Sequence, residues 1–561
     1  MPRKISEDQT RKEMIDPQLE KAGWYLRDHS KVKIEIPVDG YDAEPWNGVS
    51  DYCLYRENGE VLAVVEAKKT SVDVRLAEAQ LTHYVTEIEK HQSFRPFGFL
   101  ANGLEIHFVD VGYAPKREVF GFFTREDLEN LLFIRQNAVR LSSVDINSSI
   151  VDRAYQHEAI RRVGEAFANG KRKALIVMAT GTGKTRTTMG LIDVFMRSNQ
   201  ARRILFVADR DALVDQAKED GFEKFIPAEP CTRLRTYDLD TTKRLYAVTL
   251  QTLSNIFEQF SPAFFDLIVF DEVHRSIYNK FNEVLEYFDA RQAGLTATPA
   301  NYINRDTFLA FDCTDGKPTY LYTYEQAIED KYLVDYELYA ARTKFQRQGI
   351  HGVDLTEEER NALIEKGLDP DDIDYEGTEL EKEVSNRDTL RKQWEEIWDV
   401  CRKDSSGQLP GKTIVFAMTQ QHALRLQDAF YEMYPQFPDL AKVITHKSEY
   451  RGTLVDSFKK KDFPRIAISV DMLDTGIDVP EAVNLVFMKP VQSPIKLQQM
   501  IGRGTRVQAA CRNLALLPNF EKKDFLIIDF WENNFSRDAK EVTRRYSEDA
   551  EFRDGVRRYI H

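Results

Sequence analysis

A glycine-rich stretch after a short apolar run constrains the fold of this chain more than any other feature. Residues 178–188 read Met-Ala-Thr-Gly-Thr-Gly-Lys-Thr-Arg-Thr-Thr, and the run before them, 173–177, reads Lys-Ala-Leu-Ile-Val. Such a run is typical of a buried parallel strand, and residues 187–197 have helical spacing. In a strand–loop–helix unit, glycines let backbone N–H groups turn inward around a phosphate, and the helix N-terminus adds positive charge. The stretch therefore predicts a phosphate-binding loop.

The residue types of this loop suit a nucleotide bound with Mg²⁺. A lysine in this place reaches the β- and γ-phosphates, and the hydroxyl that follows it ligates the metal, here Thr185. The strict pattern has glycine at position 178, where this chain has Met178. The candidate nucleotide-binding residues of the loop are Thr180, Gly181, Thr182, Gly183, Lys184 and Thr185.

Length and composition limit the class of protein. The chain has 561 residues, which is too long for one hydrophobic core and predicts three or four domains. With 42% hydrophobic and 30% charged residues it has the composition of a soluble globular protein, and no apolar run approaches a membrane span. Five cysteines without a Cys-x-x-Cys pair favour free thiols in a reducing cytoplasm. The net charge of −14 means that DNA binding would depend on local basic surfaces.

The N-terminal region contains a predicted helix and a predicted hairpin that carries acidic residues. A capping box at 6–9 opens the helix, and its Glu13 and Asp16 are left out of any site because helix surfaces commonly carry carboxylates. Two β-rich runs follow, joined by Glu-Asn-Gly-Glu at 57–60, and Asn-Gly is a strong hairpin signal. A two-residue turn would pair the two glutamates of this segment and would set Asp51 opposite Glu66.

Two carboxylates in this arrangement repel each other unless a divalent cation lies between them, because opposed Cβ atoms are only about 4.5–5.5 Å apart. Lys68 shares the face of Glu66, since strand side chains alternate, and its amine could orient or deprotonate a water. The pattern suits metal-dependent phosphodiester hydrolysis. The alternative is a solvated strand face with a cross-strand ion pair. The apolar run 62–65 before Glu66 favours the metal site, as do Gln80 and Tyr84, which share one face of the next predicted helix, about 73–90.

The set Asp51…Glu66-x-Lys68…Gln80-x-x-x-Tyr84 resembles the PD-(D/E)xK nuclease core with the Gln-x-x-x-Tyr motif of RecB-like nucleases. It is most similar to the N-terminal nuclease domain of the restriction subunit of type I restriction–modification enzymes. The resemblance implies that Asp51 and Glu66 bind the metal and that Lys68 assists the attacking water. It also implies that Gln80 and Tyr84 support DNA binding and the geometry of the active site.

Further motifs surround the phosphate-binding loop. Upstream, Arg153-x-Tyr155-Gln156 precedes a predicted helix, and a glutamine that both donates and accepts suits an adenine edge. Downstream, the apolar run 265–270 ends in Asp271-Glu272. A carboxylate pair at the carboxyl end of a parallel strand can hold Mg²⁺ and activate water, here Asp271 and Glu272 respectively.

A second α/β region begins with the predicted strand at 412–417. Another predicted strand, 465–470, leads into a segment that contains Gly476 and Asp478. Arg503 and Arg506 follow three residues apart, so both could project from one helix face. Guanidinium groups placed in this way suit a γ-phosphate across a domain cleft.

The ordered motifs from about Arg153 to Arg506 resemble the superfamily 2 helicases and translocases in their DEAD/DEAH-like form. Met178 fits, because that superfamily commonly lacks the first glycine. The resemblance implies two RecA-like domains with ATP between them, and it places Arg153, Tyr155 and Gln156 at the adenine. It further implies that Thr296 and Thr298 couple hydrolysis to movement, that Gly476 and Asp478 link the second domain to nucleotide and DNA, and that Arg503 and Arg506 are the finger candidates.

The sequence therefore predicts an α/β fold, with a PD-(D/E)xK nuclease domain followed by two RecA-like parallel α/β domains. The expected boundaries are 1–145 for the nuclease domain, 146–320 for the first RecA-like domain and 321–535 for the second. An acidic insertion at about 346–385, where acids outnumber bases thirteen to three between 353 and 383, is expected to be a solvated appendage. Residues 536–561 would begin a C-terminal helical region, which implies a fragment or a short relative.

Together the resemblances imply the restriction subunit of a type I restriction–modification enzyme. Such a subunit uses ATP and Mg²⁺, moves along double-stranded DNA and cleaves unmethylated foreign DNA, while methyltransferase and specificity subunits read the sequence. Another superfamily 2 nuclease–translocase of defence or repair is an alternative, as is a nuclease-dead, ATP-gated DNA-binding module. The type III restriction subunit is disfavoured because its nuclease follows the motor.

Overall fold

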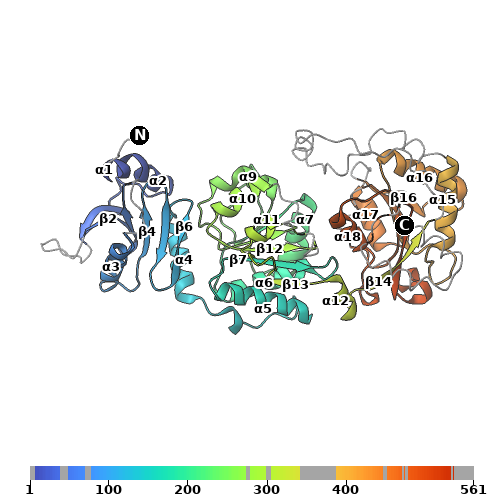
Figure 1. Ribbon diagram of the computed structural model, residues 1–561, viewed down its shortest axis with the longest axis horizontal. Helices are drawn as coiled ribbons and strands as arrows, with labels where there is room; N and C mark the ends of the chain where they lie inside the picture. Colours follow the sequence, from blue (N-terminus) through green and yellow to red (C-terminus); the bar gives the residue numbers. More distant parts are fainter. Residues whose placement is uncertain are drawn as a thin grey trace. The chain divides into compact units, whose positions relative to one another are not determined.

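In the computed structural model, the strands of the described residues form three sheets, and helices pack around them (Figure 1). The described residues are 7–37, 49–69, 77–272, 278–298, 303, 305–341, 387–445, 451–470, 473, 478–531, 533 and 535. The expected acidic insertion and the expected C-terminal helical region lie outside these residues. Within the described part, no helix is both long enough and apolar enough to cross a membrane. The chain divides into two compact units, the first of which contains residues 1–176, 185–296 and 303–321.

The first sheet is mixed and has its six strands in chain order. Only β3 and β4 pair in parallel, and helix α3 (Glu78–Glu89) connects them. The helical segment before the sheet buries Ile15 and Leu19 in the core on one face, whereas α3 buries Leu81 and Tyr84 on the other. The strands are β1 (Val32–Pro37), β2 (Val49–Tyr55), β3 (Val61–Ala67), β4 (Phe97–Ala101), β5 (Ile106–Asp110) and β6 (Ala114–Val119), and the flanking helices are α1 (Glu7–Thr10), the π-turn η1 (Arg11–Ile15), α2 (Asp16–Lys21) and α4 (Arg125–Asn137).

The turn between β2 and β3 differs from the expected two-residue turn. Gly59 N–H donates to the Arg56 carbonyl, and Arg56 N–H donates to the Glu60 carbonyl, so three residues form the loop. Gly59 has a φ of 86°, which a glycine adopts at little cost. This loop alone would shift the pairing by one residue, but Leu62 is an extra residue on β3 and restores it, so Leu54 pairs with Ala63. The expected position of Asp51 opposite Glu66 is therefore preserved by a bulge.

The second sheet has the strand order β13-β7-β12-β11-β8-β10-β9, and β8 to β12 pair in parallel. Figure 1 shows helices on both of its faces, as expected for strands that read as continuous apolar runs. Its strands are β7 (Lys173–Met178), β8 (Ile204–Ala208), β9 (Cys231–Arg233), β10 (Leu245–Thr249), β11 (Leu267–Asp271), β12 (Arg291–Thr296) and β13 (Tyr320–Tyr322). The helices around it include α5 (Ala154–Ala168), α6 (Lys184–Arg197), α7 (Asp211–Gln216), α9 (Leu250–Ile256), α10 (Tyr278–Tyr287), α11 (Arg305–Ala310) and α12 (Tyr324–Glu329).

The third sheet is parallel throughout, with the order β14-β19-β18-β15-β17-β16. Its strands are β14 (Asp335–Ala340), β15 (Lys412–Phe416), β16 (Ala441–Val443), β17 (Ile466–Ser469), β18 (Ala482–Phe487) and β19 (Asp524–Asp529), and its helices include α15 (Arg387–Val400), α16 (Gln420–Met433), α17 (Arg451–Lys460) and α18 (Pro494–Ile501). Two layers of buried side chains cover the sheet, one on each face. The expected α/β class is confirmed, with parallel strand pairing in the two sheets that follow the mixed sheet.

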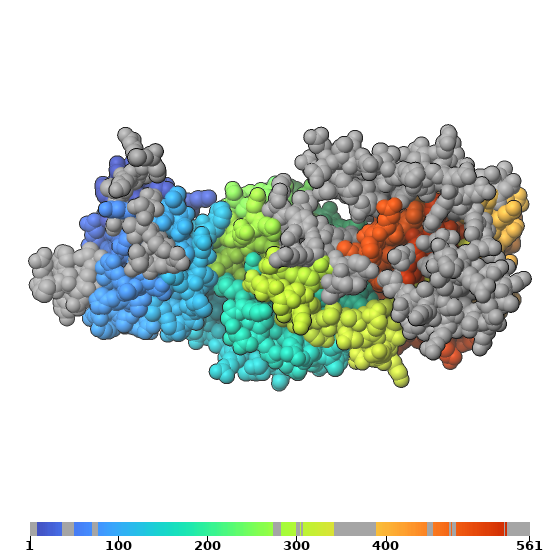
Figure 2. All heavy atoms as spheres, viewed as in Figure 1, coloured from blue at the N-terminus to red at the C-terminus, as the bar shows by residue number. Residues whose placement is uncertain are grey.

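Buried carboxylates join the regions of the first and second sheets. Arg117 of β6 binds Asp289 through two N–H groups, each 2.7 Å from a carboxylate oxygen, and Arg172 binds the same carboxylate at 2.9 Å. On α4, Asn130 donates to Asp266 at 2.7 Å. Figure 2 shows light-blue atoms of the first region against green atoms of the second, within one compact unit. The two regions are therefore joined by charged and polar contacts around the little-exposed carboxylate of Asp289 and around Asp266.

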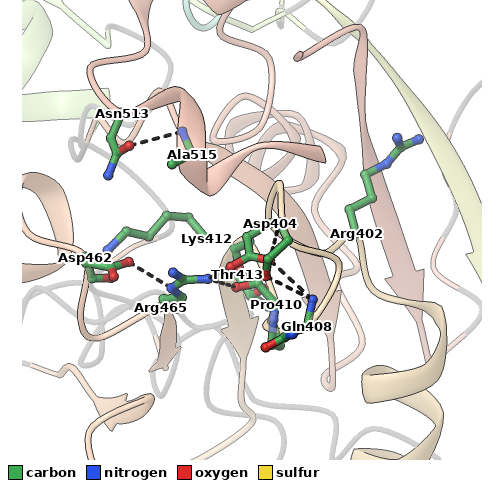
Figure 3. A network of polar contacts seen from close by, with 12 residues as sticks. Arg402, Asp404, Gln408, Pro410, Lys412, Thr413, Asp462, Arg465, Asn513 and Ala515 are labelled. Carbon is green, nitrogen blue, oxygen red and sulfur yellow. Dashed lines mark hydrogen bonds and ion pairs between the residues drawn. The ribbon is translucent and has the colours of Figure 1, made fainter. Parts of the chain in front are cut away.

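A second buried network lies in the third sheet's domain (Figure 3). Lys412, at the start of β15, is 1% exposed, and its ammonium donates to the backbone carbonyls of Lys461, Asp462 and Pro464 at 2.7–3.0 Å. Arg465 binds Asp462 at 2.8 Å beside it. These contacts fix the segment that leads into β17 against the first residue of β15. Burial lowers the pKa of Lys412 from its ordinary value of 10.5 to about 8.

We expect Asp289→Ala to destabilise the first compact unit by about 3–5 kcal/mol, because it leaves Arg117 and Arg172 without their shared carboxylate. Urea unfolding followed by fluorescence measures the change. Glu286→Ala, which deletes an exposed carboxylate in the same region, is the matched control and should change the free energy of unfolding little. Equal stability of Asp289→Ala and the wild-type chain would show that these ion pairs contribute no net stability.

The pKa of Lys412 predicts a pH-dependent stability. Between about pH 8 and 10.5 the unfolded chain binds a proton at Lys412 that the folded chain does not, so the free energy of unfolding gains from this group as the pH rises. The unfolding free energy of the wild-type chain minus that of Lys412→Met should therefore increase from pH 7.5 to pH 9.5. Lys461→Met, which removes an exposed ammonium nearby, should show no such trend. A difference that shrinks with pH would contradict the lowered pKa.

Candidate functional site

The hairpin of β2 and β3 brings the predicted nuclease residues together. Tyr52 pairs with Val65, which places Asp51 and Glu66 at the next opposed positions, and the Ala67 N–H donates to Asp51 Oδ2 at 2.7 Å. Lys68 Nζ donates to Glu66 Oε1 at 2.5 Å. The side chain of Glu66 is only 3% exposed, whereas those of Asp51 and Lys68 are 16% and 20% exposed. The cluster is thus anchored in the sheet and open to water on one side.

Helix α3 lies over the strand face to which these carboxylates belong. Strand side chains alternate, so Asp51 shares a face with Cys53, and Glu66 shares one with Val64. Cys53 and Val64 pack in one buried cluster with Tyr84 of α3. Gln80 Nε2 donates to the Tyr84 hydroxyl at 2.6 Å, so the predicted Gln–Tyr pair is formed.

The donor set of this cluster fits Mg²⁺. Asp51 and Glu66 offer carboxylate oxygens, which are the ligands that Mg²⁺ prefers. Among the described residues, no group of three or more His, Cys, Asp or Glu side chains is placed to hold a metal. Mg²⁺ commonly binds through one or two carboxylates and keeps water or substrate oxygens in its other positions, so two protein ligands suffice.

Arg11, which no sequence pattern predicted, contacts this cluster, and Glu35 contacts Arg11. Arg11 Nη1 lies 3.4 Å from Asp51 Oδ1 and 3.1 Å from Glu35 Oε1. Arg11 precedes Asp51 by forty residues, and one basic residue on a predicted helix gives no signal of such a contact. Glu35 lies in a run that the sequence analysis did not consider.

The predicted phosphate-binding loop has the expected conformation. It begins after β7 and ends where α6 starts at Lys184. Gly181 and Gly183 have φ values of 97° and 84°, in the region that favours glycine. The Thr182 hydroxyl donates to the Ala179 carbonyl at 2.7 Å and is fully buried, so this side chain stabilises the loop itself.

The departure at position 178 has a structural explanation. Met178 is the last residue of β7 and is 0% exposed, so a large apolar side chain fills the core there. Lys184 and Thr185, in the first turn of α6, remain partly exposed.

The predicted carboxylate pair lies at the end of β11. Asp271 is the last residue of this strand, and the Glu272 N–H donates to Asp271 Oδ1 at 3.1 Å. Glu272 has a φ of 56°, a conformation that costs free energy in a residue with a Cβ and that is frequent at functional sites. In the strand order, β12 lies between β7 and β11, so Thr296 ends the strand between the loop and the carboxylates. Ligands of parallel sheets bind at this carboxyl edge.

The residues expected at the adenine lie at the start of α5. Arg153 precedes the helix, and its Nη1 donates to the Tyr155 hydroxyl at 2.9 Å. Gln156 is 1% exposed and lies in the first turn. Arg153 and Tyr155 are therefore hydrogen-bonded to each other, and Gln156, the next residue in the chain, is buried.

In the third sheet's domain, Arg506 Nε donates to Asp478 Oδ1 at 2.7 Å, so two of the predicted residues are in contact. Gly476 lies outside the described residues. The expectation that Arg503 and Arg506 project from one helix face is wrong, because α18 ends at Ile501 and Arg506 forms a β-bridge with Leu333.

After this helix end the chain passes close to β19 at Gly504. A Cβ atom on Gly504 would lie 2.3 Å from the ring of Phe525. A side chain larger than that of glycine at position 504 would therefore force the Phe525 ring to shift.

Comparison with known proteins gives three matches to family models. They are described as Type I restriction enzyme R protein N terminus at residues 41–117, Type III restriction enzyme, res subunit at 149–301, and Helicase conserved C-terminal domain at 395–508. The second of these models matches the segment that carries the motifs of the second sheet. The helicase domains imply that the chain uses ATP.

Two curated relatives are type I restriction enzyme endonuclease subunits. The EcoAI subunit of Escherichia coli is 29% identical over 510 residues, which cover 86% of this chain and 59% of the relative. The EcoKI subunit of Escherichia coli strain K12 is 29% identical over 632 residues, which cover 94% and 52%. This chain thus spans little more than half the length of these relatives. A solved fragment assigned to an HsdR subunit from Vibrio vulnificus YJ016 has a TM-score of 0.50 at 24% identity, covers 98% of this chain and 96% of that one, and shares its fold.

We expect Lys184→Ala and Glu272→Gln each to lower the kcat for ATP hydrolysis by about 100-fold or more, because one removes a positive charge at the phosphates and the other a water-activating carboxylate. Release of inorganic phosphate with DNA present measures the rate in the assembled enzyme. Lys171→Ala, an exposed lysine just before β7, is the matched control. A near wild-type rate in either variant would contradict the assignment of the motor.

Proposed function

We propose that this chain, a relative of the endonuclease subunits of type I restriction enzymes, is an ATP-driven double-stranded DNA translocase with its own Mg²⁺-dependent nuclease. One observation carries the proposal: the Asp51, Glu66 and Lys68 cluster precedes a full set of motor motifs in one chain. In a type I complex, methyltransferase and specificity subunits would read and methylate the DNA. The chain itself would cleave unmethylated foreign DNA.

The nuclease chemistry follows from the hairpin. Asp51 and Glu66 would hold Mg²⁺ at the open end of the strands. When bound, the metal would polarise a phosphate oxygen and lower the pKa of a coordinated water. Lys68, held by Glu66 Oε1, would orient the attacking water by hydrogen bonding. Gln80 and Tyr84, already bonded to each other, would steady the DNA beside the cluster.

The motor chemistry uses different residues. Backbone N–H groups of the loop at 180–183 would bind the phosphates, and Lys184 would neutralise their charge. Thr185 and Asp271 would hold the Mg²⁺ of the nucleotide, and Glu272 would orient the hydrolytic water. Arg503 and Arg506 would supply positive charge to the γ-phosphate during hydrolysis.

The two chemistries can be separated by substitution. Asp51→Ala removes a metal ligand and Lys68→Ala removes the water-orienting amine, so each should lower DNA cleavage by about 100-fold or more. ATP hydrolysis and translocation should persist, because neither residue belongs to the motor motifs. Plasmid cleavage and phosphate release, measured on the complex assembled with its methyltransferase and specificity subunits, give both readouts.

Lys69→Ala is the matched control, since Lys69 is exposed and adjacent to Lys68 in the chain. Wild-type cleavage by Asp51→Ala would show that the hairpin is only a charged strand pair. Cleavage that is absent in the wild-type complex, with ATP hydrolysis intact, would favour the nuclease-dead module instead.

A further inference from the structure

A third carboxylate lies beside the two candidate metal ligands. In the pairing of β1 with β2, Ile34 faces Tyr52 and Ile36 faces Ser50, so Glu35 lies directly opposite Asp51. Glu66 lies on the other side of Asp51, on β3. Three acidic residues therefore form a row across three neighbouring strands. Like charges at such spacing repel each other and disturb the orientation of the middle carboxylate, unless a cation lies between them.

Arg11 is that cation on one side of the row. Its Nη1 lies between Glu35 Oε1 and Asp51 Oδ1, at 3.1 and 3.4 Å. Its Nε donates to the Tyr52 hydroxyl at 3.4 Å, and the guanidinium carbon lies 5.1 Å from the centre of the Tyr52 ring. Tyr52 in turn donates to Asp16 Oδ1 at 2.6 Å, on the next helical segment. The guanidinium is thus held on several sides, and its side chain is 15% exposed.

The backbone is shaped to make this contact. Arg11 opens η1, a π-turn, and such turns are frequent at functional sites. Glu35 has a φ of 54° within β1, which costs free energy in a residue with a Cβ. Its side chain is 67% exposed and pairs with Arg11, so this conformation occurs at a contact with Arg11 and not at a position packed in the core.

We propose that Arg11 is a positioning residue of the nuclease and that Glu35 anchors it without being a metal ligand. The Ala67 N–H holds Asp51 Oδ2, and Arg11 holds Asp51 Oδ1, so the carboxylate plane is fixed. A carboxylate oxygen has two lone pairs, so Oδ1 can accept from Arg11 and still bind a metal. Arg11 also offsets the charge of Glu35. This role rests on the proposed nuclease function, because it acts through Asp51.

The test measures metal affinity directly. The full chain without nucleotide is titrated with Mn²⁺, and binding is followed by calorimetry. Arg11→Ala should weaken Mn²⁺ binding by about 10–100-fold, as is usual when a partner that orients a metal ligand is removed. Arg11→Lys should recover part of the affinity, because lysine keeps the charge but not the planar fork. Lys12→Ala, which removes an exposed neighbour that pairs only with exposed Asp8, should leave binding unchanged.

Further variants keep the test decisive. Glu35→Gln removes the charge that pairs with Arg11. It should also weaken Mn²⁺ binding, but by less than Arg11→Ala. The Mg²⁺ concentration for half-maximal DNA cleavage should rise in step with the loss of affinity, while circular dichroism and ATP hydrolysis stay as in the wild type. A purely structural role would alter the latter two and leave the Mg²⁺ requirement unchanged.

Two outcomes separate this inference from the proposed function. Mn²⁺ binding by Arg11→Ala that equals or exceeds that of the wild-type chain would overturn the positioning role. If Asp51→Ala loses Mn²⁺ binding in the same series, the proposed nuclease nevertheless stands. Unchanged binding by Asp51→Ala would instead overturn the metal site itself, and with it both proposals.

Discussion

The pairing register of β2 and β3 is the constraint on which the nuclease cluster depends. A slip of one residue would move every side chain of the strand to the other face and separate Asp51 from Glu66. The register is held from within the sheet, because Val65 and Ala67 are buried on one face and Val64 on the other. The extra residue at Leu62 and the three-residue turn compensate each other. The chemistry at the strand ends therefore follows from packing several residues away.

Much of this architecture could be predicted from local patterns. Apolar runs that end in glycine or carboxylate residues correctly predicted β7 and β11, and two glycines predicted the positive φ angles of the loop. The errors arose where tertiary contacts override local geometry. The turn at 57–59 is one residue longer than Asn-Gly suggests, and Arg506 forms a β-bridge with Leu333 instead of sharing a helix face with Arg503. Periodicity carries no information about the bridge from Arg506 to Leu333, because that partner lies far away in the chain.

The contacts that could not be predicted join residues far apart in sequence. Arg11 reaches Asp51 across forty residues, and Arg117 reaches Asp289 across 172. The sequence around each of these two arginines contains no motif that would single it out. Asp16 shows the same limit, because a carboxylate dismissed as a surface group accepts a hydrogen bond from Tyr52. Motifs identify residues that bind ligands, whereas the residues that orient them are recognised only from the folded chain.

The buried carboxylate contacts show how the region of the first sheet is joined to the second sheet. The residues of the second region in these contacts lie just before its strands: Arg172 before β7, Arg203 before β8, Asp266 before β11 and Asp289 before β12. The region of the first sheet therefore packs against the amino edge of the second sheet. The nucleotide motifs follow the same strands at the carboxyl edge. Strands of this length span about 17–20 Å, so these carboxylate contacts lie about one strand length from Asp271 at the end of β11. A substitution at one edge can then leave the other edge intact, while the contacts of Asp266 and Asp289 join the region of the first sheet to the second sheet.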